Sequence, residues 1–191
     1  MKRIFVIDNY DSFTYNLVHA LEEIAGCPVT VKRNDELDFS ELATYDYIIL
    51  SPGPGIPDEA GDLKKAIIEF ASKKKILGVC LGHQAIGEAF GASLKNLDEV
   101  YHGVQTDIIC SDEPGELLDN IENVFPGGRY HSWVIQKESL PPEFTVTCRD
   151  DAGEIMGIRH KTLNVHGVQF HPESVLTPAG KTILKNFLSM N

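Results

Sequence analysis

The stretch KILGVCLGHQAIGEAFG, residues 75–91, passes directly from an apolar run into a helical pattern and decides the fold class. Its first part predicts a buried strand over Lys75–Val79. A helix is expected to begin after Cys80 and to end at Gly91, because glycine is common just past a helix terminus. A strand that leads straight into a helix is the repeating unit of parallel α/β sheets with right-handed crossovers.

The same rhythm continues through the chain and predicts an open, mostly parallel, twisted α/β sheet flanked by helices. Further strands are predicted over Arg3–Ile7, Val29–Lys32, Tyr47–Leu50, Val104–Cys110, Phe144–Cys148, Ile155–His160 and Val165–Phe170. Helices are predicted after a cap at Asp11 or Ser12 with a stop at Gly26, over Leu63–Lys74, and over Pro178–Leu188. Neither a repeat nor a linker interrupts this order, so residues 1–191 are expected to form a single domain.

Composition excludes several classes of function. The chain has 17 basic and 28 acidic residues, a net charge of −11, which argues against nucleic acid or an anionic membrane surface as the main partner. No apolar run is long enough to span a bilayer, and the start MKRI leads into a strand and not into a signal peptide. The four cysteines are widely spaced without a C-x-x-C pair, so we expect a reduced, cytoplasmic protein.

Cys80 lies between Gly78 and Gly82, the Gly-x-Cys-x-Gly arrangement of a nucleophile elbow. Such a turn strains its central residue and needs small neighbours. The helix that follows would favour a thiolate at its N-terminus. A buried core cysteine is the commoner fate of a lone cysteine, but two glycines at a strand–helix junction favour a nucleophile here. The remaining cysteines lack this setting and are expected to be structural: Cys27, Cys110 and Cys148.

A thiolate that attacks a carbonyl needs a base, and His171 is the best candidate among seven histidines. It follows a predicted strand, and the motif His171-Pro172-Glu173 supplies a carboxylate that can orient the imidazole and set its tautomer. His83 is confined to the helix surface beyond Cys80, where it is expected to pack or to face solvent. The other histidines considered lack an orienting carboxylate or lie on an exposed helix face: His19, His160 and His166.

A loop after another predicted strand, Ser51-Pro52-Gly53-Pro54-Gly55, offers an oxyanion site. Proline has no N–H, so Gly53 and Gly55 are the donors of its Pro-Gly-Pro-Gly segment, and Gly53 N–H can pair with Leu81 N–H. Carboxyl ends of strands meet at one edge of an α/β sheet, so this loop, Cys80 and His171 are expected to converge. No P-loop, G-x-G-x-x-G or H-E-x-x-H motif is present, so no cofactor or metal is expected in this chain.

Together these motifs resemble the class I (triad) glutamine amidotransferases. The resemblance rests on GVCLGHQ (78–84), QFHPE (169–173) and PGPG (52–55), and it extends over essentially the whole chain. Three further motifs, DNYDSFT (8–14), PDEAG (57–61) and RYHS (129–132), are similar to the small subunits of anthranilate synthase and aminodeoxychorismate synthase. The resemblance implies a flavodoxin-like open sheet.

It also implies roles for individual residues. Cys80 matches the nucleophile that attacks the side-chain amide of L-glutamine, His171 matches the general base and acid, and Glu173 matches its carboxylate partner. Gly53 and Leu81 match the oxyanion hole. The substrate-binding positions are Gly53, Pro54, Gly55, Gln84, Ser132 and Trp133. Trp133 departs from the leucine more familiar there, but since family contacts at this point run largely through the backbone, glutamine binding is expected to survive.

A partner is implied as well, because a glutaminase without an ammonia user would waste its substrate. The expected partner is a chorismate-binding synthase subunit that holds Mg²⁺. Part of the surface for it is expected in the loop Asn9, Tyr10, Asp11, Ser12 and Phe13, for which an ordinary capped strand–helix turn is the alternative.

Several functions stay open at this point. Anthranilate synthesis for tryptophan is the main expectation, and aminodeoxychorismate synthesis for folate, or a subunit shared by both, is the alternative. A stand-alone γ-glutamyl cysteine hydrolase is more remote, since Gln84 and Ser132-Trp133 favour an amidotransferase. A catalytically silent binding subunit would not need Cys80, His171 and Glu173 together.

Overall fold

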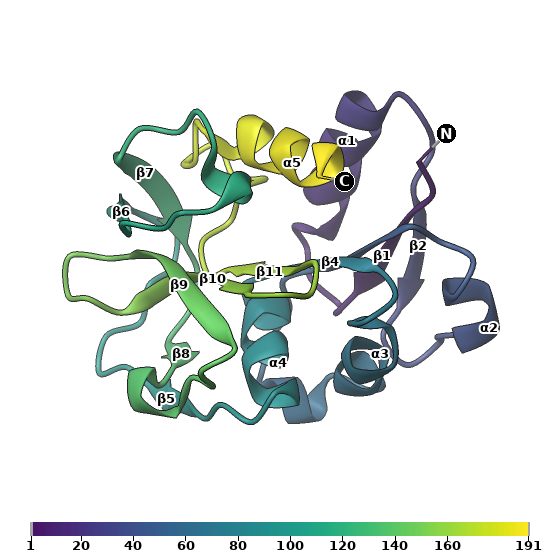
Figure 1. The fold of residues 1–191 in the computed structure, drawn as a ribbon, viewed down its shortest axis with the longest axis horizontal. Coiled ribbons are helices and arrows are strands. Elements are labelled where there is room, and N and C mark those ends of the chain that lie inside the picture. Colours follow the sequence, from purple (N-terminus) through teal and green to yellow (C-terminus); the bar gives the residue numbers. More distant parts are fainter. Residues whose placement is uncertain (1, 191) are drawn as a thin grey trace.

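The computed structural model describes residues 2–190, which contain eleven strands and five α-helices (Figure 1). The strands are β1 (Ile4–Asp8), β2 (Thr30–Arg33), β3 (Tyr47–Leu50), β4 (Lys75–Val79), β5 (Leu94–Asn96), β6 (Val104–Cys110), β7 (Val124–Arg129), β8 (Trp133–Ile135), β9 (Phe144–Arg149), β10 (Ile155–His160) and β11 (Val165–Val168). The helices are α1 (Thr14–Ala25), α2 (Phe39–Leu42), α3 (Leu63–Phe70), α4 (Leu81–Ala89) and α5 (Gly180–Ser189).

The strands of the main sheet lie in the order β2-β1-β3-β4-β11-β10-β9-β6-β7, and β5 pairs with β8 in a small second sheet. β2, β1, β3, β4 and β11 are parallel, which confirms the predicted open α/β sheet. From β11 outward each pairing is antiparallel. Because the direction alternates there, β9 and β7 run the same way as β4 and β11. The carboxyl ends of all these strands therefore meet at one edge.

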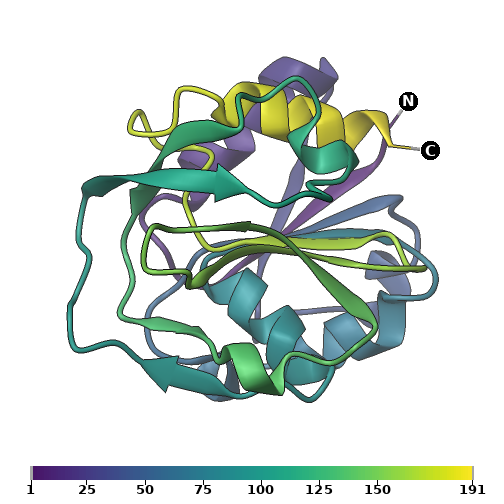
Figure 2. The ribbon, with the colours of Figure 1, turned by 60° about the vertical axis from the view of Figure 1, so that its left-hand side comes forward.

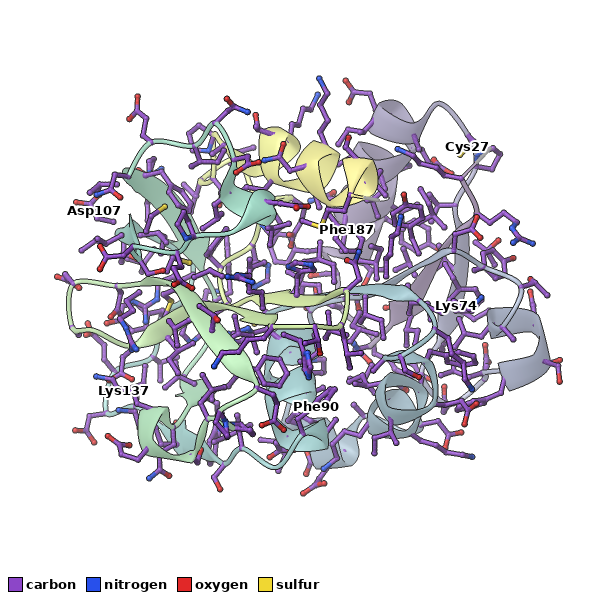
Figure 3. The ribbon with its side chains drawn as sticks, in the orientation of Figure 1. Cys27, Lys74, Phe90, Asp107, Lys137 and Phe187 are labelled. Atoms are coloured by element: carbon purple, nitrogen blue, oxygen red, sulfur yellow. The ribbon has the colours of Figure 1, made fainter. Side chains whose placement is uncertain are left out.

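Helices cover both faces of the sheet and create two cores. α1 and α5 lie on one face and α3 and α4 on the other, as Figures 1 and 2 show. Successive side chains of a strand point to opposite faces, so Ile4 and Val6 of β1 pack with α1 and α5, while Phe5 and Ile7 pack with α3 and α4. Phe187 of α5 is fully buried on the side turned toward the sheet (Figure 3). The central parallel strands β1, β3 and β4 are thus apolar along most of their length, as expected for a sheet covered on both faces, whereas the edge strand β2 is only partly buried.

Most predicted elements are present, with shifts at their ends. β3, β4, β6 and β10 have the predicted bounds, and Gly26 ends α1 in the left-handed conformation. The prediction that Asp11 or Ser12 caps α1 is wrong: Phe13 is the N-cap, and the Asp11 carboxylate accepts a hydrogen bond from Phe13 N–H instead. Helix α3 stops at Phe70 and turns before β4.

Candidate active site

Cys80 occupies a strained turn between β4 and α4. Its φ of 52° and ψ of −103° place a non-glycine residue in a region that side chains avoid. The flanking glycines are required by space: a Cβ on Gly78 would lie 2.4 Å from the carbonyl of Gly82, and one on Gly82 would lie 2.4 Å from Leu50 O. The turn therefore has the geometry predicted for a nucleophile elbow.

His171 and Glu173 form a buried pair after β11. The distance between His171 Nδ1 and Glu173 Oε1 is 2.7 Å, and both side chains are almost fully buried. Since a carboxylate accepts and does not donate, Nδ1 carries the proton and Nε2 is left to act. Within residues 2–190, Nε2 has no hydrogen-bond partner. The predicted orientation of the imidazole by Glu173 is thus present.

The electrostatics of His171 link it to Cys80. Burial by itself would lower its pKa, but the Cys80 sulfur and then the Glu173 carboxylate stabilise the imidazolium, and together they raise the pKa well above 6.5. The rings of Tyr130 and Phe13 pack against the imidazole with centroid distances of 4.7 and 5.9 Å. Two aromatic rings therefore flank the imidazole of His171, while the Cys80 sulfur and the Glu173 carboxylate stabilise its charged form.

The other histidines do not compete with His171. His83 is fully buried against Gly167 of β11, and burial lowers its pKa to about 3, so it is a neutral packing residue, the first of the two alternatives that were expected, and does not face solvent. His19 is exposed on α1, as predicted. His160 Nδ1 accepts the backbone N–H groups of Thr162 and Leu163, which gives it a structural role in a turn.

The Ser51–Gly55 loop lies directly beside the elbow. A Cβ on Gly53 would be 2.6 Å from both Asn9 Cβ and Leu81 Cδ2, so the two predicted oxyanion donors belong to neighbouring backbone segments. Asn9 fixes the loop: its N–H donates to Ser51 Oγ and its Nδ2 donates to Ser51 O, both at 2.8 Å. Asn34 Nδ2 holds Asn9 Oδ1 at 3.0 Å.

A cavity of about 260 Å³ opens in front of Cys80. It brings together all of the predicted substrate-binding positions, which are Gly53, Pro54, Gly55, Gln84, Ser132 and Trp133. Ser132 lies in the segment that connects β7 to β8, and Trp133 is the first residue of β8; neither strand was predicted from the sequence. Gln84 Nε2 donates to Trp133 O at 2.8 Å, which fixes this wall of the cavity through the backbone of Trp133 and not through its ring.

The loop predicted as partner surface divides into exposed and buried residues. Tyr10 is 49% exposed and Ser12 is exposed, whereas Asp11 and Phe13 are half-buried. The prediction is wrong for Asn9, which is buried because its side chain is bonded to Ser51 and Asn34. Burial raises the pKa of Asp11 despite its bond to Phe13 N–H, and the charges of His171 and Glu173 also act on it. The loop thus joins the surface to the site.

Sequence reasoning missed the supports of the cavity wall. Arg129, which is fully buried at the end of β7, donates to Asp150 Oδ2 at 2.8 Å and to His131 Nε2 at 3.1 Å. Its guanidinium lies 3.6 Å from the centre of the Tyr101 ring. In the sequence, the motif RYHS contributes only to the resemblance. The one sequence feature that could have indicated the role of Arg129 is its apolar setting. Its partner Asp150 lies twenty-one residues further along the chain, after β9.

Neither a helix able to cross a bilayer nor a cluster of three or more metal-ligating side chains is found within residues 2–190.

The sequence and the fold of this chain are similar to those of several known proteins. The profile of the family "Glutamine amidotransferase class-I" matches residues 5–190. The chain is 46% identical over 187 residues to "Aminodeoxychorismate/anthranilate synthase component 2" of Bacillus subtilis, with 97% of this chain and 95% of that protein covered. It is 45% identical over 193 residues to "Bifunctional protein TrpGD" of Thermotoga maritima, and it spans 32% of the length of that protein. A crystal structure from Thermoplasma acidophilum, described as that of a GMP synthase subunit, has a TM-score of 0.88 at 29% identity, covering 98% of this chain and 92% of that one.

Proposed function

The chain belongs to the class-I glutamine amidotransferase family, and on that premise we propose that it is the glutaminase subunit of anthranilate synthase. It hydrolyses L-glutamine to glutamate and passes the ammonia to a synthase subunit. The observation that supports this most is the geometry around Cys80: a left-handed elbow at a cavity, with the His171–Glu173 pair acting on its sulfur.

The first half of the reaction follows from the charges of the site. The Cys80 thiolate attacks the side-chain carbonyl carbon of glutamine, and the carbonyl electron pair moves onto oxygen. Gly53 N–H and Leu81 N–H stabilise that oxyanion. Because its pKa is raised, His171 starts as an imidazolium and has a proton to give. It protonates the amide nitrogen, the carbon–nitrogen bond breaks, and ammonia leaves a γ-glutamyl thioester.

In the second half of the reaction the same residues act, but His171 now accepts a proton instead of donating one. His171, now neutral, takes a proton from water, whose oxygen attacks the thioester carbon. The carbon–sulfur bond breaks, its electron pair returns to Cys80, and glutamate is released. Glu173 stabilises the imidazolium in both halves and keeps the reactive nitrogen turned to the substrate.

The substrate is held by the cavity wall opposite the elbow. Ser132 and Trp133 bind its α-amino and α-carboxylate groups, and Gln84 also contacts the glutamine. The backbone of Trp133 is fixed by Gln84, so the unusual tryptophan ring does not have to take part in binding.

The proposed partner binds chorismate and Mg²⁺ and uses the ammonia, while this chain contributes no cofactor. The relative from B. subtilis, named for both aminodeoxychorismate and anthranilate synthesis, keeps aminodeoxychorismate synthesis as a second candidate, either alone or in a shared subunit. Since ring regiochemistry is set by the partner, the pathway is decided by the synthase chain that co-purifies. The product formed from chorismate and glutamine by that complex identifies the pathway.

The test of the glutaminase assignment is Cys80→Ala in the complex with the synthase subunit. We expect glutamine-dependent synthesis to disappear and synthesis from ammonium salts to continue. Cys110→Ala, at a partly buried cysteine far along the chain in β6, is the control and is expected to keep both activities. Glutamine-dependent synthesis by Cys80→Ala would show that the nucleophile lies elsewhere.

A further inference from the structure

Gln169 lies directly after β11, two residues before His171, and its fully buried side chain reaches the nucleophile. Its Nε2 is 3.5 Å from Cys80 Sγ, and its Oε1 is 3.2 Å from Gln84 Nε2. A distance of 3.5 Å is long for a bond to oxygen but suits an N–H donor to the larger sulfur atom. The reacting atom thus has a hydrogen-bond donor that the proposed mechanism does not use.

The direction of this amide is fixed by Gln84. An amide can be turned by 180°, so its donor must be established from its neighbours. Gln84 Nε2 lies 2.8 Å from Trp133 O, and a backbone carbonyl only accepts, so the Gln84 nitrogen is the donor. The same nitrogen then faces the oxygen of Gln169. The remaining Gln169 group, its NH₂, points at the Cys80 sulfur.

A second set of bonds holds Trp133 O in place. His131 Nδ1 lies 3.0 Å from this oxygen, and His131 Nε2 lies 3.1 Å from Arg129 Nε. Because Arg129 can only donate, His131 Nε2 accepts and Nδ1–H donates to Trp133 O. Burial lowers the pKa of His131 to about 3, so this neutral tautomer persists across the working range of pH. Asp150 fixes Arg129 at 2.8 Å.

We propose that Gln169 is a catalytic residue: its amide N–H binds the Cys80 sulfur, holds it in one orientation and stabilises its negative charge. A hydrogen bond of this kind is strongest when sulfur is charged. It therefore favours the thiolate before attack and again when the carbon–sulfur bond breaks and the electron pair returns to sulfur. The catalytic part of this role rests on the proposed glutaminase function, but the effect on the thiolate does not.

The test is the rate of alkylation of Cys80 by iodoacetamide as a function of pH, followed by mass spectrometry of the Cys80 peptide. Gln169→Met keeps the volume and removes the donor. The pH midpoint of alkylation should rise by about one unit, as expected for the loss of one hydrogen bond to a charged group. Gln169→Glu places an acceptor and a charge at the sulfur, so it should raise the midpoint further. His171, the charged group that faces the sulfur, is unchanged in both variants.

His166→Asn is the matched control, because His166 is a buried polar residue three positions earlier and packs against Phe187 instead of the site. It should lower Tm without moving the midpoint. In the complex, Gln169→Met should lower kcat for glutamine about tenfold while KM stays within about threefold. If a Gln169 variant that folds is alkylated with the same pH midpoint as the wild-type protein, the proposal is overturned. A shifted midpoint in a protein that never delivers glutamine nitrogen would instead overturn only the proposed function.

Discussion

His171 is the residue whose environment defines the chemistry of the site. Its ring is enclosed by Tyr130 and Phe13, its Nδ1 is bonded to Glu173, and the Cys80 sulfur acts on its charge. Each contact restricts the ring to one plane or favours one protonation state. The raised pKa follows from these contacts, because the effects of the Cys80 sulfur and the Glu173 carboxylate together outweigh the cost of burying the imidazolium.

Glu173→Gln tests this account through the pH profile of the glutaminase. Replacing the carboxylate with an amide removes a charge that raises the pKa of His171, so that pKa falls. The imidazolium needed for the first proton transfer is lost above the pKa. The alkaline limb of kcat/KM should therefore move to lower pH in the variant.

The size of the loss distinguishes Glu173 from the base itself. His171→Ala should lower kcat by about 10³-fold, within the range of general acid–base catalysis. Glu173→Gln should cost less, since the imidazole remains. Equal losses, or an alkaline limb that does not move, would show that Glu173 does more than orient and charge the ring.

At the scale of elements, the junction between β4 and α4 depends on close backbone packing. Gly82, in the first turn of α4, approaches Leu50 at the end of β3 so closely that a methyl group would meet a backbone oxygen. Backbone atoms of a central strand cannot move aside without disturbing the sheet. The position of Cys80 is thus set by how near α4 lies to β3.

Gly82→Ala should therefore destabilise the protein by about 2–4 kcal/mol and lower kcat, because α4 must shift and carry Cys80 with it. Gly87→Ala is the matched control in the same helix. Its methyl group would meet the movable end of the Ile135 side chain, and alanine is the better helix former, so stability should change little. Urea unfolding and glutaminase kinetics of both variants measure this. Similar unfolding free energies for the two variants would contradict it.

β7, which the sequence analysis did not predict, lacks a local strand signal for a physical reason. β7 contains Pro126-Gly127-Gly128, a combination that normally marks a turn, and it is tolerated because β7 is an edge strand. Its glycines are needed for space: a Cβ on Gly127 would lie 2.7 Å from Ile108 Cγ1. Local pattern could not show this, because the reason lies in a neighbouring strand.

Across the whole molecule, the sequence predicted the parallel half of the sheet and the convergence of three motifs at its carboxyl edge. Buried strands with strong apolar runs, such as Tyr47–Leu50, have a local signal. Contacts between distant polar residues have none. Asn9 reads as a loop residue, yet it holds the Ser51 loop, and Gln169 reads as the end of a strand, yet it reaches Cys80. Such roles depend on strand order, which the antiparallel half of the sheet completes.

Folding of the whole molecule buries several histidines in their neutral form. Burial lowers the pKa of His83 and His131 to about 3 and that of His166 to about 4. In the unfolded chain a histidine titrates near 6.5. Between these values the unfolded state binds more protons than the folded state, so folding stability falls as pH is lowered.

We therefore expect the free energy of unfolding to fall from pH 6.5 to pH 5, with a limiting slope of about 1.4 kcal/mol per pH unit for each of the three histidines. His171 opposes this only near pH 6.5, where the unfolded state has partly lost its proton; because its pKa is raised in the folded state, both states bind the proton toward pH 5 and its contribution becomes constant there. Urea unfolding at several pH values measures the slope. His166→Asn should reduce the slope by about one proton, whereas His19→Asn, at an exposed position, should leave it unchanged. If the slope in the wild-type protein is below about 1.4 kcal/mol per pH unit, which corresponds to one proton, the buried histidines are already charged in the folded state.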